Sequence, residues 1–89
     1  MIEVEYNRDF LKDLKKLPRS IQKKLGDLED MFRENPFHPE LHSKGLHGKL
    51  RNLYSFRITR DYRVIYLFLD EEKALFLFVG HRKDVYKKI

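Results

Sequence analysis

The alternation of hydrophobic and polar residues predicts four β-strands. Residues 2–6 alternate between apolar and polar side chains, as a strand with one buried face does. Three later runs are also strand-like, at 52–58, 62–69 and 74–80. The last run is apolar on both faces, which is typical of a strand with a neighbour on each side. Short turns separate these three runs, so we expect an antiparallel meander.

Between the first strand and the others, apolar residues recur at helical spacing. One helix is expected from a cap at Asn7 to a stop at Pro18. A second is expected from a cap at Ser20 to the break at Asn35-Pro36. Because only two or three residues connect them, the helices should form an antiparallel hairpin.

Two segments remain. Proline and glycine punctuate residues 36–51, which predicts a loop, and loops of about sixteen residues are often functional. Residues 83–89 are expected to form a short C-terminal helical turn. The order β-α-α-β-β-β predicts one α+β domain over residues 1–89, with the helical hairpin on one face of a small, mainly antiparallel sheet.

Composition narrows the classes of function. The chain of 89 residues has no cysteine, which excludes disulfides and thiolate chemistry. No apolar run suits a membrane span and the N-terminus lacks a secretory pattern, so a cytoplasmic protein without a membrane partner is expected. His38, His42 and His47 have spacings that raise the question of a metal site. No HExxH motif or carboxylate cluster accompanies them, so we expect neither metal nor cofactor.

The net charge of +5 is concentrated in one segment. Residues 41–66 hold six Lys or Arg against Asp61 alone, whereas residues 1–40 have a net charge of −1. A local excess of this kind attracts a polyanion, although it can also be a solvated basic face. The residues that we expect to contact such a polyanion are Lys44, Lys49, Arg51, Arg60 and, after the last strand, Lys83.

Five side chains form the candidate catalytic site. Alternation places Arg57 on the side of the sheet that the helices leave open, Arg63 opens the next strand and Arg82 follows the last. In a meander these arginines should converge, with His81 and Tyr86 at the rim. Guanidinium groups bind phosphate through paired hydrogen bonds, so the cluster predicts a phosphate site.

Each of these residues also has a structural alternative. The arginines can pair with Asp61, Glu72 or Asp84. His81 can cap a helix, and Tyr86 can anchor the C-terminus. The neighbouring cations of His81 favour its neutral form, in which an imidazole serves as a base.

These segments resemble the RelE/ParE superfamily of bacterial and archaeal type II toxins. The resemblance covers nearly the whole chain. It rests on the helix pair followed by Leu46-His47-Gly48, Tyr54-Ser55-Phe56-Arg57-Ile58, Tyr62-Arg63-Val64-Ile65-Tyr66 and Val79-Gly80-His81-Arg82-Lys83-Asp84-Val85-Tyr86.

The resemblance to the RelE-like branch implies an mRNA interferase. Such toxins enter the ribosome and cleave mRNA without metal, by attack of a 2′-hydroxyl on the adjacent phosphate. By position, Arg57 and Arg63 would clamp the phosphate, Arg82 would lie near the leaving oxygen and Tyr86 would orient the nucleotide. Ser55 stands where the best-known branch has a lysine, so His81 is the expected base.

The resemblance also implies partners. These are a small acidic antitoxin, the ribosome and mRNA, and operator DNA only through the antitoxin complex. Two alternative functions remain: a ParE-like inhibitor of DNA gyrase without nuclease activity, and an inactive relic that only binds an antitoxin.

Overall fold

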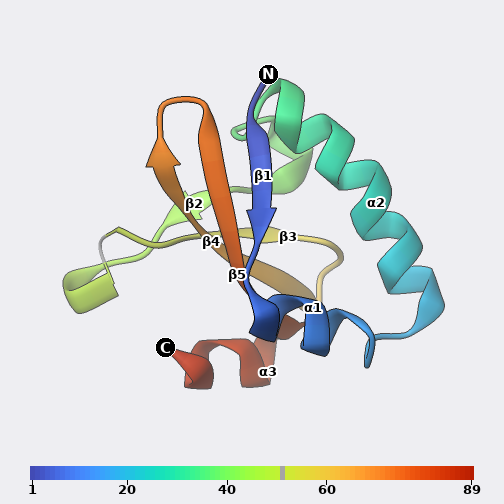
Figure 1. The fold of residues 1–89 in the computed structure, drawn as a ribbon. Coiled ribbons are helices and arrows are strands. Elements are labelled where there is room, and N and C mark those ends of the chain that lie inside the picture. The colour runs from blue at the N-terminus through green and yellow to red at the C-terminus, as the bar shows by residue number, and fades with distance from the viewer. Residues whose placement is uncertain (51) are drawn as a thin grey trace.

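A single five-stranded sheet organises the protein, whose computed structural model describes residues 1–50 and 52–89 (Figure 1). In chain order the elements are β1 (Glu3–Tyr6), α1 (Arg8–Leu14), α2 (Arg19–Glu34), η1 (Pro39–Leu41), β2 (Lys44–Gly45), η2 (Gly48–Leu50), β3 (Tyr54–Arg57), β4 (Tyr62–Asp70), β5 (Lys73–His81), α3 (Arg82–Val85) and η3 (Tyr86–Lys88), where η marks a short 3₁₀ turn.

The strands lie in the order β1-β5-β4-β3-β2. The meander β3-β4-β5 is antiparallel as predicted, and β5 has a neighbour on each side. The chain enters the sheet through β1, which pairs with β5 in the parallel direction. The predicted α+β class is confirmed, with one more strand, β2, than the sequence indicated.

Both long helices contribute to the core on one face of the sheet. Asn7 caps α1 as predicted, and its side chain accepts a hydrogen bond from the Asp9 N–H at 3.0 Å. The predicted cap of α2 is wrong, because the helix begins at Arg19 and Pro18 takes the capping position. The fixed φ of a proline, here −53°, suits the start of a helix without a side-chain cap.

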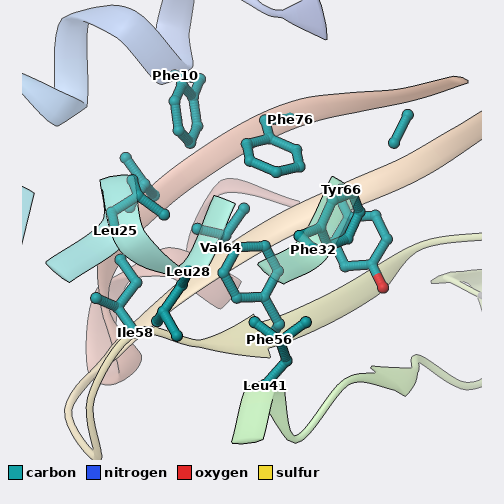
Figure 2. Close-up of a cluster of buried hydrophobic side chains, with 12 residues drawn as sticks. Phe10, Leu25, Leu28, Phe32, Leu41, Phe56, Ile58, Val64, Tyr66 and Phe76 are labelled. Carbon is teal, nitrogen blue, oxygen red and sulfur yellow. The ribbon is translucent and has the colours of Figure 1, made fainter. Parts of the chain in front are cut away.

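Aromatic rings fill the centre of the core (Figure 2). The Phe32 ring of α2 lies 4.9 Å from Tyr66, 5.2 Å from Phe76 and 5.5 Å from Phe56, measured between ring centroids. The Tyr66 hydroxyl, red in Figure 2, is buried without a hydrogen-bond partner among the described residues. Burial raises the pKa of Tyr66 to about 12.

The prediction of a loop at 36–51 is wrong in part, because η1, β2 and η2 lie within it. Leu41 is fully buried and anchors η1 in the core. The Ser43 hydroxyl donates to the Pro36 carbonyl oxygen at 2.6 Å and closes the segment. Local turns and one apolar anchor thus order a stretch that has no helical or strand periodicity.

The opposite face of the sheet is only partly open. The C-terminal α3 packs against β4 and β5, and Val85 is fully buried. Ser55, which alternation placed on the open face, is only 1% exposed. The C-terminal segment therefore turns the sheet face beside Arg57 into a sheltered site.

No helix in the described part of the chain combines the length and the apolar character that crossing a membrane requires.

Candidate functional site

Arg57 and Arg63 lie directly opposite each other on neighbouring strands. They are Cα partners in the β3-β4 ladder, whereas Phe56 and Val64, the adjacent pair, are buried in the core. Since successive side chains alternate between faces, both arginines project from the face opposite α1 and α2. Like charges in this position repel each other, so the free protein holds two cations together at a cost in stability.

The turn between β3 and β4 fixes Arg63. Its Nη1 donates to the carbonyl oxygens of Arg60 at 2.8 Å, Thr59 at 3.0 Å and Tyr62 at 3.4 Å. Because one guanidinium nitrogen makes these contacts, the others remain able to donate to a ligand.

The pKa of Arg63 shows that the cluster is electrostatically crowded. Burial lowers this pKa, and the positive charges of Arg57 and Arg82 lower it further. Tyr86 acts in the opposite direction and raises it. The side chains of Arg57, Arg82 and Tyr86 therefore each lie close enough to Arg63 to affect its charge, and the three arginines line one pocket.

An acidic neighbour accompanies Arg82. Its Nε lies 3.6 Å from Asp61 Oδ1, and its backbone N–H donates to the Asp61 carbonyl oxygen at 2.6 Å. The two side chains are 42% and 53% exposed, so this ion pair is weak and open to competition. No described carboxylate lies within ion-pair distance of Arg57 or Arg63.

Tyr86 reaches the site from the C-terminal 3₁₀ turn η3. Its hydroxyl donates to Ser55 Oγ at 3.4 Å. The turn is fastened by an ion pair between Lys88 and Asp13 of α1. The position of the tyrosine therefore depends on residues far from it in sequence.

His81 has the capping position that the sequence left as its alternative. Its Nδ1 accepts the Lys83 N–H at 3.1 Å, and its ring packs edge-on against Tyr62 at 5.5 Å. When Nδ1 accepts a hydrogen bond, the proton of a neutral imidazole lies on Nε2. In this geometry Nε2 is a donor, and accepting a proton requires the cap to open.

The expected RNA-contacting residues lie at different distances from the cluster. Arg60 lines the same pocket as the three arginines. Lys44 is the Cα partner of Ser55, so its side chain shares the face of Arg57 and Arg63. Lys49 lies in η2 and Lys83 in α3, both exposed. Arg51 lies outside the described residues.

A pocket of about 570 Å³ connects these groups to the helical side of the molecule. Sequence reasoning missed part of its lining. Neither α2, nor the segment around η1, nor the turn between β3 and β4 carries a motif that marks Lys24, Glu40, His42 or Thr59 as pocket residues, and only the fold brings them together in one lining. The pocket is lined by Lys24, Leu28, Glu40, His42, Arg57, Ile58, Thr59, Arg60, Arg63 and Arg82.

At the edge of β3 away from β4, the described residues of β2 pair only with Tyr54 and Ser55, and the pocket is lined by Arg57 and Ile58, further along the chain. The Ile58 N–H donates to the Tyr62 carbonyl oxygen at 2.9 Å. Alternation therefore turns the N–H and C=O of Arg57 away from β4, toward this edge. Within the described residues, no three His, Asp or Glu side chains gather closely enough to hold a metal ion.

Comparison with known proteins identifies the family. Residues 4–86 match the family model described as the ParE toxin of the type II toxin-antitoxin system parDE. The chain belongs to this toxin family, and the predicted membership of the RelE/ParE superfamily is confirmed. No curated protein matches the chain significantly.

Solved structures of toxins share the fold. A YoeB/ParE toxin from Agrobacterium tumefaciens superposes with a TM-score of 0.78 at 16% identity, over 91% of this chain and 99% of that one. YafQ in the E. coli DinJ-YafQ complex superposes with a TM-score of 0.78 at 19% identity, over 97% of this chain and 99% of that one. The archaeal RelE-RelB complex from Pyrococcus horikoshii contains a chain that superposes with a TM-score of 0.75 at 24% identity, over 91% of this chain and 94% of that one.

Proposed function

We propose that this toxin is a ribosome-dependent mRNA endonuclease. The observation that carries the proposal is the cross-strand pair Arg57 and Arg63, with Arg82 lining the same pocket. Three guanidinium groups around one exposed pocket suit the charge that a phosphodiester develops as it is cleaved. The repulsion among them is relieved when an anion binds.

In the proposed reaction the 2′-oxygen of a ribose attacks the adjacent phosphorus. The bond from phosphorus to the 5′-oxygen breaks, which leaves a 2′,3′-cyclic phosphate and a 5′-hydroxyl. A base takes the proton of the 2′-hydroxyl, and an acid gives a proton to the leaving 5′-oxygen. Arg57 and Arg63 hold the non-bridging oxygens, and Arg82 lies near the leaving oxygen.

Several residues share the orientation of the nucleotide and the transfer of protons, because Ser55 stands where the best-known branch has a lysine. Tyr86 orients the nucleotide from its place beside Ser55. Lys44 lies opposite Ser55 on the neighbouring strand. Its ammonium group replaces the lysine that the best-known branch has at the position of Ser55, and it donates a proton to the leaving oxygen. His81 is the proposed base, and it acts with the Lys83 cap open.

The partners follow from the same surfaces. We propose a small acidic antitoxin as partner, as the complexes of RelE with RelB and of YafQ with DinJ suggest. On the face of the arginines, Leu67 pairs with Leu75 and Leu69 is 47% exposed, so apolar and basic groups adjoin there. The other proposed partners are the ribosome with its mRNA, and operator DNA reached through the antitoxin.

A ParE-like action on DNA gyrase is the second candidate. It is favoured by the family model itself, which describes a ParE toxin. It also agrees with two features that do not suit a nuclease: Ser55 stands where the RelE-like branch has a lysine, and the His81 ring is engaged in capping α3. On this alternative the arginines bind a partner and no bond is cleaved.

Mapping transcripts after induced expression separates the two candidates. The nuclease should produce cuts within translated codons, with 2′,3′-cyclic phosphate ends. Arg57→Ala and Arg82→Ala should abolish both the cuts and the growth arrest, whereas Arg19→Ala, an exposed arginine outside the pocket, should change neither. Intact mRNA together with trapped gyrase-DNA breaks would overturn the proposal in favour of the second candidate.

A further inference from the structure

One wall of the pocket differs chemically from the rest. Glu40 and His42 line it beside the guanidinium groups. No described cation lies within ion-pair distance of Glu40, although five Lys and Arg side chains line the same pocket. A carboxylate repels a phosphate, so Glu40 would weaken a pocket that bound phosphate alone.

This wall is fixed before any ligand arrives. Leu41, between the two residues, is fully buried. The Glu40 N–H donates to Nδ1 of His38 at 3.1 Å, and the His42 N–H donates to the Pro39 carbonyl oxygen at 3.2 Å. The backbone of such a preorganised turn loses little further entropy when its side chains bind a ligand.

His42 has a backbone conformation that favours glycine. Its φ is +50°, and among the described residues it is the one non-glycine residue with a positive φ. A Cβ makes this left-handed conformation costly. Strain of this kind is concentrated at functional sites, and here it occurs at a residue that lines the pocket.

The remaining surfaces of this part of the pocket suit a flat ring. Leu28 and Ile58 supply apolar lining, and the edge of β3 presents the N–H and C=O of Arg57. A nucleobase has apolar faces and a polar edge, and the neighbouring arginines account for its phosphate. An exocyclic amino group on that edge is a natural partner for a carboxylate.

We infer that Glu40 and His42 form a base-recognition subsite for the nucleotide next to the phosphate held by the arginines. Glu40 accepts N–H groups from the base edge, and His42 contacts the ring. Guanine, with two adjacent N–H donors, is preferred, and uracil, which lacks an amino group, is bound least well. The inference rests on the proposed function, because it presupposes single-stranded RNA in the pocket.

The test uses RNA that the toxin cannot cleave. Fluorescence anisotropy would give dissociation constants for labelled 2′-O-methyl hexamers of A, C, G and U. The wild-type protein should bind the G hexamer about tenfold more tightly than the U hexamer, as one charge-assisted hydrogen-bond pair allows. Glu40→Gln should reduce this preference severalfold while tightening the binding of inorganic phosphate, because a negative charge is removed. Glu34→Gln, on the exposed end of α2, is the matched control and should change neither.

His42→Gly separates binding from folding. Glycine accepts the positive φ, so the variant should be at least as stable as the wild type and yet lose affinity for all four hexamers. In NMR titrations with the G hexamer the His42 ring protons should shift, whereas those of His47, exposed and outside the pocket lining, should not.

The outcomes distinguish this inference from the proposed function. If the wild type binds hexamers without base preference, or if Glu40→Gln tightens all four equally, the subsite is overturned and the nuclease proposal stands. The subsite is also overturned if His42→Gly binds like the wild type. If the wild-type protein binds no hexamer and transcripts stay intact in cells, the proposed function itself fails.

Discussion

At the scale of single residues, two features of this toxin reduce its stability. Arg57 and Arg63 face each other across two strands with no described carboxylate between them. Tyr66 holds a buried hydroxyl with no described partner. The first feature belongs to the proposed phosphate site, and the second lies inside the core, where nothing in the structure gives it a role.

Replacing Arg57 should stabilise the fold while it removes activity. Arg57→Thr relieves the cross-strand repulsion with a residue that suits strands, and should raise the free energy of unfolding by about 0.5 kcal/mol. Loss of one phosphate donor should lower the rate of RNA cleavage about a hundredfold. Urea unfolding and single-turnover cleavage on ribosomes measure the two effects, and a destabilised variant would show that the repulsion is absent.

Tyr66→Phe should stabilise the protein, because it removes an unpaired buried hydroxyl worth about 1 kcal/mol. It should also change the alkaline limb of the stability profile. The folded-state pKa of about 12 exceeds the ordinary 10.0, so the folded protein keeps this proton when the unfolded chain has lost it. Stability therefore falls between pH 10 and 12, by about 2 kcal/mol, and Tyr66→Phe should abolish that part of the fall.

The control for this alkaline effect is Tyr54→Phe, at a half-buried tyrosine of β3. This variant should retain the loss of stability above pH 10. Chemical denaturation at a series of pH values between 10 and 12 would give the free energy of unfolding of each variant. Equal slopes for Tyr66→Phe and the wild type would mean that the Tyr66 hydroxyl is paired in solution.

Residue patterns predicted part of the site. Period-two alternation was enough to place Arg57 on the face away from the helices, because Phe56 must enter the core. The role of His81 could not be read in this way, since its capping contact depends on where β5 ends and α3 begins. Glu40 escaped notice because it belongs to no periodic pattern, and His42 stood out only as a candidate metal ligand, because nothing in the sequence places it beside the arginines.

At the scale of elements, the C-terminal turn η3 has a positioning task. It brings Tyr86 to Ser55 and is fastened to α1 through Lys88 and Asp13. The sequence predicted a helical turn here, and it could not predict the contact with α1, which lies 75 residues away. Such pairings are set by the packing of whole elements.

Lys88→Met should therefore reduce the rate of cleavage about tenfold without unfolding the protein, since small displacements of an aligned group are costly. Lys87→Met is the matched control, because Lys87 contacts only Asp84 of the preceding helix in the described structure. In a Tyr86→Phe background the Lys88 effect should disappear. A tenfold loss that persists in that background would assign Lys88 a direct role with RNA.

The same scale explains what the sequence could establish about the fold. Strong periodicity located both helices and the meander to within a few residues. The alternation of residues 2–6 also located β1, but neither its parallel pairing with β5 nor the two-residue β2 left a mark in the sequence, because neither needs more than a few backbone hydrogen bonds. The edge of β3 that β2 leaves open, and with it the pocket, thus became visible only in three dimensions.

At the scale of the whole molecule, much of the excess positive charge gathers around one pocket. The basic segment 41–66 supplies Arg57, Arg60 and Arg63 to one pocket, and Arg82 joins them from the end of β5. Asp61 offsets a fraction of this charge at the surface. Binding of a polyanion should accordingly depend on ionic strength.

The slope of that dependence is a prediction about the assembled pocket. For an uncleavable RNA, the logarithm of affinity should fall with the logarithm of salt concentration, with a slope of about −0.7 for each phosphate that the protein neutralises, the one between the arginines included. Arg57→Gln should make the slope shallower, by up to about 0.7. Arg8→Gln, at the exposed start of α1, should leave it unchanged, and an equal change in both variants would assign the effect to overall charge.

The facing arginines also carry a practical consequence. Two facing cations with no described carboxylate within ion-pair distance attract whatever small anion the medium provides. Sulfate or phosphate from a purification buffer would occupy the proposed phosphate site and compete with RNA for it. The measured potency of this toxin would then reflect the choice of buffer salt, and chloride solutions of low concentration would reveal it most fully.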